Sequence, residues 1–215
     1  FSGGEDIFLV KYNSNGVKQW TKQVGTSSND IAKGIAIDSS GNVYLAGETS
    51  GALDSQSNAG GKDLFLMKYN SSGTKQWTKL LGTSSDESAN GIAIDSSNNI
   101  YITGNTGGAL DSQTNSGNTD LFLVKYNSSG TKQWTKLLGS SAQENGNAIA
   151  MDSSNNIYLT GATFGALDGQ TNAGGVDIFL VKFDSNGTKK WTKLLGTSEN
   201  QYGYGITVDS SDNIY

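Results

Sequence analysis

Cysteine, histidine and proline are all absent from this chain of 215 residues. Without cysteine there is no disulfide framework, no thiolate nucleophile and no sulfur ligand for zinc. Without histidine the chain lacks the commonest general base and the commonest transition-metal ligand. These absences disfavour several classes of enzyme and metalloprotein, and we expect neither a cofactor nor a bound metal.

Apolar residues and positive charge are also scarce. Hydrophobic residues make up 34% of the chain, and no apolar run approaches the roughly 18 residues that a membrane-spanning helix needs. The formal net charge of −5 disfavours the phosphate backbone of a nucleic acid as a partner. Lysines such as Lys11, Lys22, Lys68 and Lys79 recur within strand-like segments, where we expect solvated side chains and no basic patch.

A strict repeat dominates what is present. Trp20, Trp77, Trp134 and Trp191 lie 57 residues apart, and the segments 62–118 and 119–175 are identical at 42 of 57 positions. Such a repeat predicts units that pack mainly against their neighbours. Because each residue recurs in every copy, the repeat is strong evidence for the architecture and weak evidence for a single catalytic centre.

Each repeat contains four short strand-like segments and no helical period. They are typified by GIAID, NIYITG, DLFLMKYN and TKQWTKLLG, separated by turns in which Gly73 supplies a positive φ and Asp95 can cap the backbone. Four meandering strands per unit predict an all-β fold, a β-propeller with four-stranded blades. Because blades converge at the axis, we expect the small GIAID strand innermost, followed outward by the other three in the order given.

The phase of the repeat predicts how a single domain, 1–215, is divided. Residues 27–83, 84–140 and 141–197 form three complete blades, while 1–26 supply two outer strands and 198–215 two inner strands of one composite blade. One chain could close a four-bladed ring in this way, or two chains could exchange terminal strands as an eight-bladed homodimer. Because Phe1 opens within a loop, we also consider a fragment of a longer array.

The strings GIAIDSSGNVYLAG (34–47) and LDGQTNAGGVDIFLVKFDSNGTKKWTKLLGTS (167–198) resemble the SBBP-type bacterial β-propeller repeat family. The resemblance covers essentially the whole chain, and its hairpin half is also similar to NHL-type propeller repeats. It implies a bacterial exported or cell-surface protein used for binding or assembly, and it implies no particular reaction.

The long loops 48–62, 105–119 and 162–176 should emerge on one face of a propeller, and loops on a rigid scaffold often bind ligands. One interpretation is a set of repeated lectin-like pockets that grip sugar hydroxyls. The alternative is a loop-folding motif, in which Leu53, Leu110 and Leu167 plug the clefts between blades while Asp and Asn cap their own backbone. The candidate ligand-binding residues are Asp54, Gln56, Asn58, Asp111, Gln113, Asn115, Asp168, Gln170 and Asn172.

The loops between blades, 26–33, 83–90, 140–147 and 197–204, differ most from copy to copy. They suggest either a diversified rim for partner recognition or drift in solvated loops. The candidate partner contacts are Asp30, Glu87, Glu144, Glu199, Tyr202 and Tyr204.

Three further patterns favour structural roles. The turns at 38–42, 95–99, 152–156 and 209–213 have too few oxygens for a calcium shell, so Asx-turn capping is the better account. The four tryptophans should pack between blades. Glycosidase chemistry needs one carboxyl with a raised pKa, and no acidic pair differs from its copies, so we assign no catalytic residue.

The sequence therefore predicts a non-catalytic binding or scaffold module, secreted or on the bacterial surface, whose ligand is a protein or a glycan. A polysaccharide-active hydrolase or lyase using loop carboxylates is the alternative from another class. A purely structural part of a surface assembly is the third.

Overall fold

A computed structural model describes residues 3–215, and these residues divide after Ala89 into two compact units. The described residues contain fourteen strands and two short 3₁₀ turns. The first unit holds β1 (Ile7–Tyr12), β2 (Lys18–Val24), β3 (Asp30–Ile37), β4 (Val43–Thr49), η1 (Leu53–Ser55), β5 (Asp63–Tyr69) and β6 (Lys75–Leu81). The unit boundary falls within β7 (Glu87–Ile94), which is followed by β8 (Ile100–Thr106), η2 (Leu110–Ser112), β9 (Asp120–Tyr126), β10 (Lys132–Leu138), β11 (Glu144–Met151), β12 (Ile157–Thr163), β13 (Asp177–Phe183) and β14 (Lys189–Leu195).

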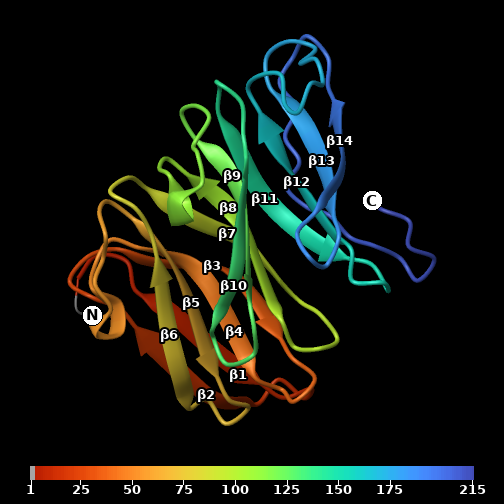
Figure 1. The fold of residues 1–215 in the computed structure, drawn as a ribbon. Coiled ribbons are helices and arrows are strands. Elements are labelled where there is room, and N and C mark those ends of the chain that lie inside the picture. Colours follow the sequence, from red (N-terminus) through yellow and green to blue (C-terminus); the bar gives the residue numbers. More distant parts are fainter. Residues whose placement is uncertain (1–2) are drawn as a thin grey trace. The chain divides into compact units, whose positions relative to one another are not determined.

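The strands form three four-stranded sheets and one two-stranded sheet, all antiparallel wherever the pairing is described (Figure 1). The sheet orders are β3-β4-β5-β6, β7-β8-β9-β10, β11-β12-β13-β14 and β1-β2. Each four-stranded sheet is a meander in sequence order, which confirms the predicted blade and its strand order. No helix in the described part of the chain is long and apolar enough to cross a membrane.

The first strand of each blade is longer than predicted. We expected a strand over 91–95 and a polar loop over 83–90, but β7 begins at Glu87. The register of the matching strands slips between Ala32 and Gly34 and between Gly146 and Ala148. This irregularity explains why the start of the strand was predicted too late. An extra residue in one strand breaks the alternation of apolar and polar residues by which a strand is recognised in the sequence.

The tight turns follow the predicted capping. In the turn before β4, Asp38 Oδ1 accepts the backbone N–H groups of Ser40 and Asn42, each at 2.9 Å. Its Oδ2 accepts the Tyr44 hydroxyl at 3.0 Å. The fourth turn residue has positive φ in every copy, and glycine supplies it only in the first, as Gly41 with φ 77°.

The apolar cores lie between neighbouring sheets. In the first unit, Leu53 packs in a cluster with Ile7 and Leu9 of β1 and Phe65 of β5. In the second unit, the cluster around Leu167 joins residues of β8 and β9 to residues of β12 and β13. Leu53 and Leu167 therefore plug the space between sheets, as the loop-folding interpretation predicts.

The tryptophans contribute to the same packing. The ring centroids of Trp77 and Tyr44 are 6.0 Å apart within one sheet. Trp20 and Trp134 lie against turn glycines of the following sheet, where an added Cβ on Gly73 or Gly187 would approach the indole within 2.9 and 3.1 Å. These contacts agree with the predicted structural role.

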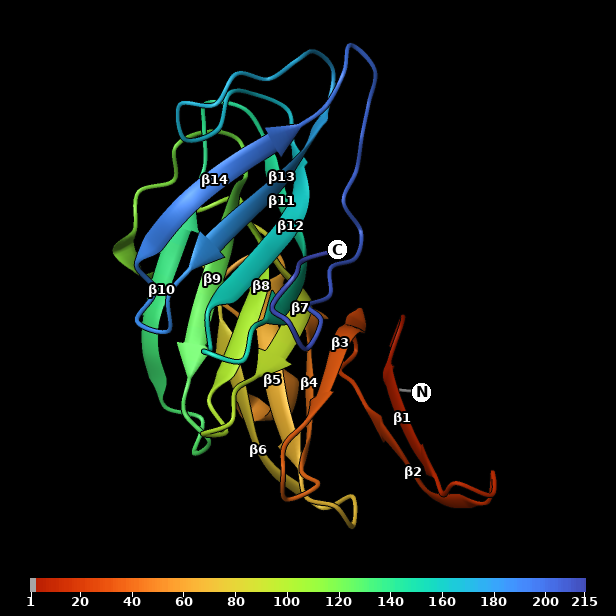
Figure 2. The same ribbon diagram turned by 90° about the vertical axis from the view of Figure 1, so that its right-hand side faces the viewer.

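Each of the two predicted half-blades is present within its own unit. β1 and β2 form the two-stranded sheet. Residues 205–215 form a short hairpin, in which the backbones of Thr207 and Tyr215 exchange two hydrogen bonds of 3.0 Å; Figure 2 shows this segment following β14 as a trace. Their union in one composite blade, and the division of 1–215 into blades, stay predictions.

Candidate functional site

The long loop of each repeat folds back onto the last strand of its own sheet. Asp54, in η1 with φ 51° and ψ 40°, forms an ion pair with Lys75 and accepts a hydrogen bond from the Thr78 hydroxyl. Asp111 makes the same contacts with Lys132 and Thr135.

The third loop repeats the ion pair, between Asp168 and Lys189. Burial raises the pKa of Asp168, but the hydrogen bonds from Lys189 and Thr192 and the positive charge of Lys189 together outweigh it, so the pKa is lowered. The three aspartates are thus ion-paired with the last strand of their own sheets and are not free to bind a ligand alone.

The loop asparagines are also used internally. Asn58 donates to the Thr49 carbonyl at 3.2 Å and accepts the Gly60 N–H at 3.0 Å. Asn115 and Asn172 make the corresponding pairs of bonds. Of the nine predicted ligand-binding residues, these six fold the loop.

The loop glutamines differ, because their side chains are exposed: Gln56, Gln113 and Gln170. In the first unit, a shallow depression of about 310 Å³ opens beside η1. Its lining residues are Asp54, Ser55, Gln56, Lys75, Gln76, Trp77 and Thr78. The depression combines an ion pair, two amides and the half-buried indole of Trp77, a set that suits a hydroxylated ligand with one apolar face.

Three of the predicted partner contacts are buried. Asp30 is 1% exposed, and Glu87 and Glu144 are 0% exposed. Each carboxylate caps the loop before its strand; Glu87, for example, accepts the Thr83 backbone N–H at 2.6 Å and the Thr83 hydroxyl at 2.8 Å. The prediction that these three residues are exposed in solvated loops is therefore wrong. A carboxylate that accepts several hydrogen bonds can be buried, and a run of polar residues in the sequence does not show whether such donors are present.

The last copy has a different cap. Gln201 occupies the in-phase position and accepts the Thr197 N–H at 2.8 Å. Glu199, Tyr202 and Tyr204 lie at the surface, and the two tyrosine rings stack with centroids 5.9 Å apart. A partner role for these three residues stays a prediction.

The carboxyls with raised pKa lie inside the sheets. Burial raises the pKa of Asp63 and Asp120, although backbone N–H donors oppose the shift. Both residues are at most 1% exposed, and the Oδ1 atom of each is buried without a hydrogen-bond partner. Neither can reach a substrate as a general acid. Within residues 3–215, no three acidic side chains gather into a candidate metal-ligand set.

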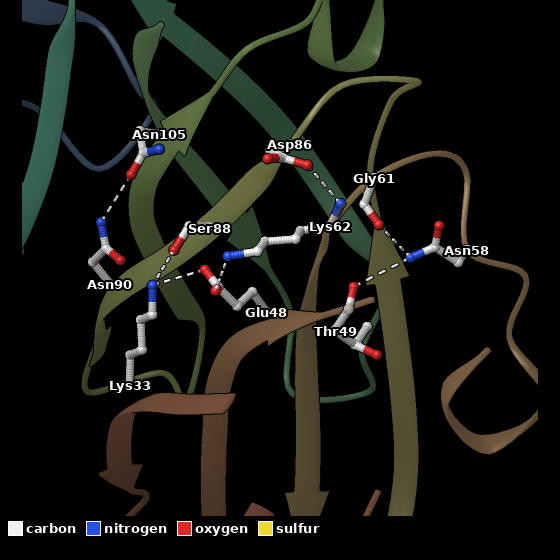
Figure 3. Close-up of polar contacts among 10 residues, drawn as sticks. All are labelled: Lys33, Glu48, Thr49, Asn58, Gly61, Lys62, Asp86, Ser88, Asn90 and Asn105. Carbon is white, nitrogen blue, oxygen red and sulfur yellow. Dashed lines mark hydrogen bonds and ion pairs between the residues drawn. The ribbon is translucent and has the colours of Figure 1, made fainter. Parts of the chain in front are cut away.

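A charged cluster joins Lys33, Glu48 and Lys62 (Figure 3). Glu48, at the end of β4, is 4% exposed, and its two carboxylate oxygens each accept an ammonium at 2.7 Å, one from Lys33 and one from Lys62. Lys33 also donates to the Ser88 hydroxyl at 2.7 Å. Burial raises the pKa of Glu48, but the hydrogen bonds from Lys33, Lys62 and Ser88 and the charge of Lys33 together outweigh it and lower the pKa to about 2.

The cluster was not predicted from the sequence, but the residues at the same positions of the other copies mark it. Glu48 corresponds to Asn105 and Ala162, and Lys33 corresponds to Asn90 and Asn147. In the second unit, Asn90 donates to Asn105 Oδ1 at 3.0 Å. The pair of side chains at these positions is therefore charged in the first copy, consists of two amides in the second, and combines an amide with an alanine in the third.

The ion cluster predicts a stability difference that depends on pH. Because the pKa of Glu48 is depressed on folding, its stabilisation is full above the unfolded pKa near 4.5 and disappears as pH falls toward 2. We expect the free energy of unfolding of the wild type to exceed that of the Glu48→Gln variant by about 3 kcal/mol at pH 6. The difference between the two should disappear near pH 2. Urea unfolding at a series of pH values measures it, and a gap that stays constant with pH would contradict the assignment.

The repeats of the chain are similar to a known repeat family. The β-propeller repeat family SBBP matches residues 19–54, 76–110, 133–175 and 190–215. The chain belongs to the SBBP family. It is 29% identical, over 91% of its length, to an uncharacterised WD repeat-containing protein of Acanthamoeba polyphaga mimivirus, and 28% identical, over 81%, to the regulatory protein FlaEY of Caulobacter vibrioides. The chain covers 19% and 20% of these two relatives.

A solved structure shares the fold. A Bacteroides caccae protein of unknown function superposes with a TM-score of 0.52 at 9% identity, over 98% of this chain and 64% of that one. At this identity the likeness extends to the fold alone.

Proposed function

We propose that the chain is a non-catalytic recognition module of the SBBP family that binds a glycan through its long loops. The depression between η1 and β6 is the observation that carries this proposal. Its ion pair and amides can hydrogen-bond sugar hydroxyls while the indole of Trp77 receives the apolar face of the ring. The matching ion pairs at Asp111 and Asp168 support a site that recurs in the other repeats.

The names of the relatives also favour recognition over catalysis. One is a WD repeat-containing protein and the other a regulatory protein. A protein ligand on the same loops is the alternative within this class. A hydrolase is less well supported, because the loop aspartates are paired with lysines and the carboxyls with raised pKa are buried.

The exposed glutamines give the sharpest test, because they line the loops without holding them together. On an array of immobilised polysaccharides, we expect Gln56→Ala, Gln113→Ala and Gln170→Ala each to weaken binding about threefold. The triple variant should lose about 100-fold, because linked weak sites act together.

Gln19→Ala is the matched control, since Gln19 is an exposed glutamine on β2 outside the three loops. Loss confined to one loop variant would indicate a single site and contradict repeated recognition. Absence of binding to every glycan would overturn the glycan proposal. Sugar turnover that one variant abolishes would instead favour the hydrolase.

We also propose that the protein is exported to the bacterial surface or secreted. The proposal rests on the SBBP resemblance. Fractionation of the producing cells tests it, and recovery of all the protein inside the cell would contradict it.

A further inference from the structure

Two serines in the long loops have an unfavourable backbone conformation. Ser55 has φ 62° and Ser112 has φ 60°, which is the left-handed region that favours glycine. In the described part of the chain, every other residue with positive φ is a glycine, an asparagine or an aspartate. These three types enter the left-handed region more readily than serine does. The two serines are therefore exceptions within this fold.

The third long loop shows that glycine fits at the same position. Its in-phase residue is Gly169, which has φ 73°, and no atom lies within 4 Å of a Cβ added there. Asp168 still forms its ion pair with Lys189, as the aspartates of the first two loops do with their lysines. The loop therefore closes onto its sheet without a serine.

The two serine hydroxyls make no contact within the fold that would offset the strain. Asp54 also has positive φ, but its carboxylate is bonded to Lys75 and Thr78. Ser55 and Ser112 are exposed, and neither hydroxyl has a hydrogen-bond partner among the residues that the structure describes. The interactions that hold the loop therefore do not explain why serine occurs in place of glycine.

Ser55 is a lining residue of the depression between η1 and β6. Its hydroxyl can both donate and accept a hydrogen bond, which matches the hydroxyls of a sugar. In the second repeat, residues 111–113 and 132–135 have the same types as the seven lining residues. The third repeat differs at two of these positions, where Gly169 and Lys190 replace a serine and a glutamine.

We propose that the hydroxyls of Ser55 and Ser112 each hydrogen-bond a hydroxyl of the bound glycan. This contact rests on the proposed function and adds two binding residues to it. Backbone strain is retained at binding sites when the strained residue contributes to the ligand. The third loop, with Gly169, lacks the contact.

Two double variants separate the hydroxyl from the backbone strain. Ser55→Ala with Ser112→Ala removes both hydroxyls and keeps each Cβ, whereas Ser55→Gly with Ser112→Gly also relieves the strain. On an array of immobilised cellulose, chitin, xylan and alginate, we expect both doubles to bind about 20-fold more weakly than wild type, because each site loses one hydrogen bond. The glycine double should also raise the midpoint of thermal unfolding by about 4 °C, and the alanine double should leave it within about 1 °C.

The reverse change tests the third loop. Gly169→Ser should strengthen binding to the same array about fivefold, because it adds the missing hydroxyl. It should also lower the midpoint of thermal unfolding by about 2 °C, since it introduces the strain. Ser57→Ala with Thr114→Ala is the matched control, because it removes two exposed hydroxyls at in-phase positions of the first two loops, and Ser57 does not line the depression.

The outcomes distinguish this contact from the proposed function. If wild type binds a polysaccharide and the alanine double binds it within twofold of wild type, the serine contact is overturned and glycan recognition stands. A loss in the glycine double alone, or an equal loss in the control, would also overturn the contact. If wild type binds none of the four polysaccharides, the contact fails together with the proposed function.

Discussion

Gly161→Ala is expected to lower the free energy of unfolding by about 3 kcal/mol, because there is no space for a Cβ at this position. Gly161 lies in the middle of β12. A Cβ there would lie 1.8 Å from the Asn145 carbonyl oxygen and 2.8 Å from the ring of Phe179. The carbonyl belongs to the paired strand β11, and Phe179 is 0% exposed, so neither neighbour can move away cheaply.

Urea unfolding followed by tryptophan fluorescence measures this effect. Gly205→Ala is the matched control, since no atom lies within 4 Å of its added Cβ and its φ is not positive. We expect the control to change stability by less than about 0.5 kcal/mol. If Gly161→Ala were as mild as the control, the close pairing of β11 and β12 would be wrong.

Glu144→Ala should cost a similar amount, about 3 kcal/mol, because it removes the acceptor from three donors at a fully buried site. The Ser140 backbone N–H and the Ser140 hydroxyl each donate to Glu144 at 2.6 Å. The Thr163 hydroxyl donates at 2.9 Å. In the alanine variant these groups would remain buried without a partner.

Glu144→Gln separates hydrogen bonding from charge. The last repeat already has glutamine at this position: Gln201 accepts the Thr197 N–H and donates to the Thr197 hydroxyl, both at 2.8 Å. We therefore expect Glu144→Gln to cost only about 1 kcal/mol. Thermal unfolding of both variants beside wild type decides the question. Equal losses would mean that the negative charge, and not the cap, stabilises the loop.

Much of the fold could be predicted because the same pattern of strands and turns recurs in each 57-residue unit. The spacing from Trp20 to Trp191 and the alternation of strands with Asp-capped turns predict four-stranded meanders in the observed order. The plug role of Leu53 and Leu167 could also be inferred, since an apolar residue within a polar loop has to be buried somewhere.

The candidate site was less accessible from sequence. The aspartates at 54, 111 and 168 looked like ligands because they recur in polar loops, yet each is paired with a lysine 21 residues later. The partners of Glu48 lie 15 residues before it and 14 residues after it, and only the folding of three strands brings them together. Neither pairing has a local sequence signal.

The sequence by itself determined the all-β class, the 57-residue unit, the strand order within each blade and the capping of the tight turns. These features depend on neighbours close in the chain or on a pattern that repeats. Only the tertiary structure decided which polar groups are inside, such as Glu144, and which remain at the surface, such as Gln56. The physical reason is that a polar group can be buried only where distant strands supply its hydrogen-bond partners, and chain composition does not encode that supply.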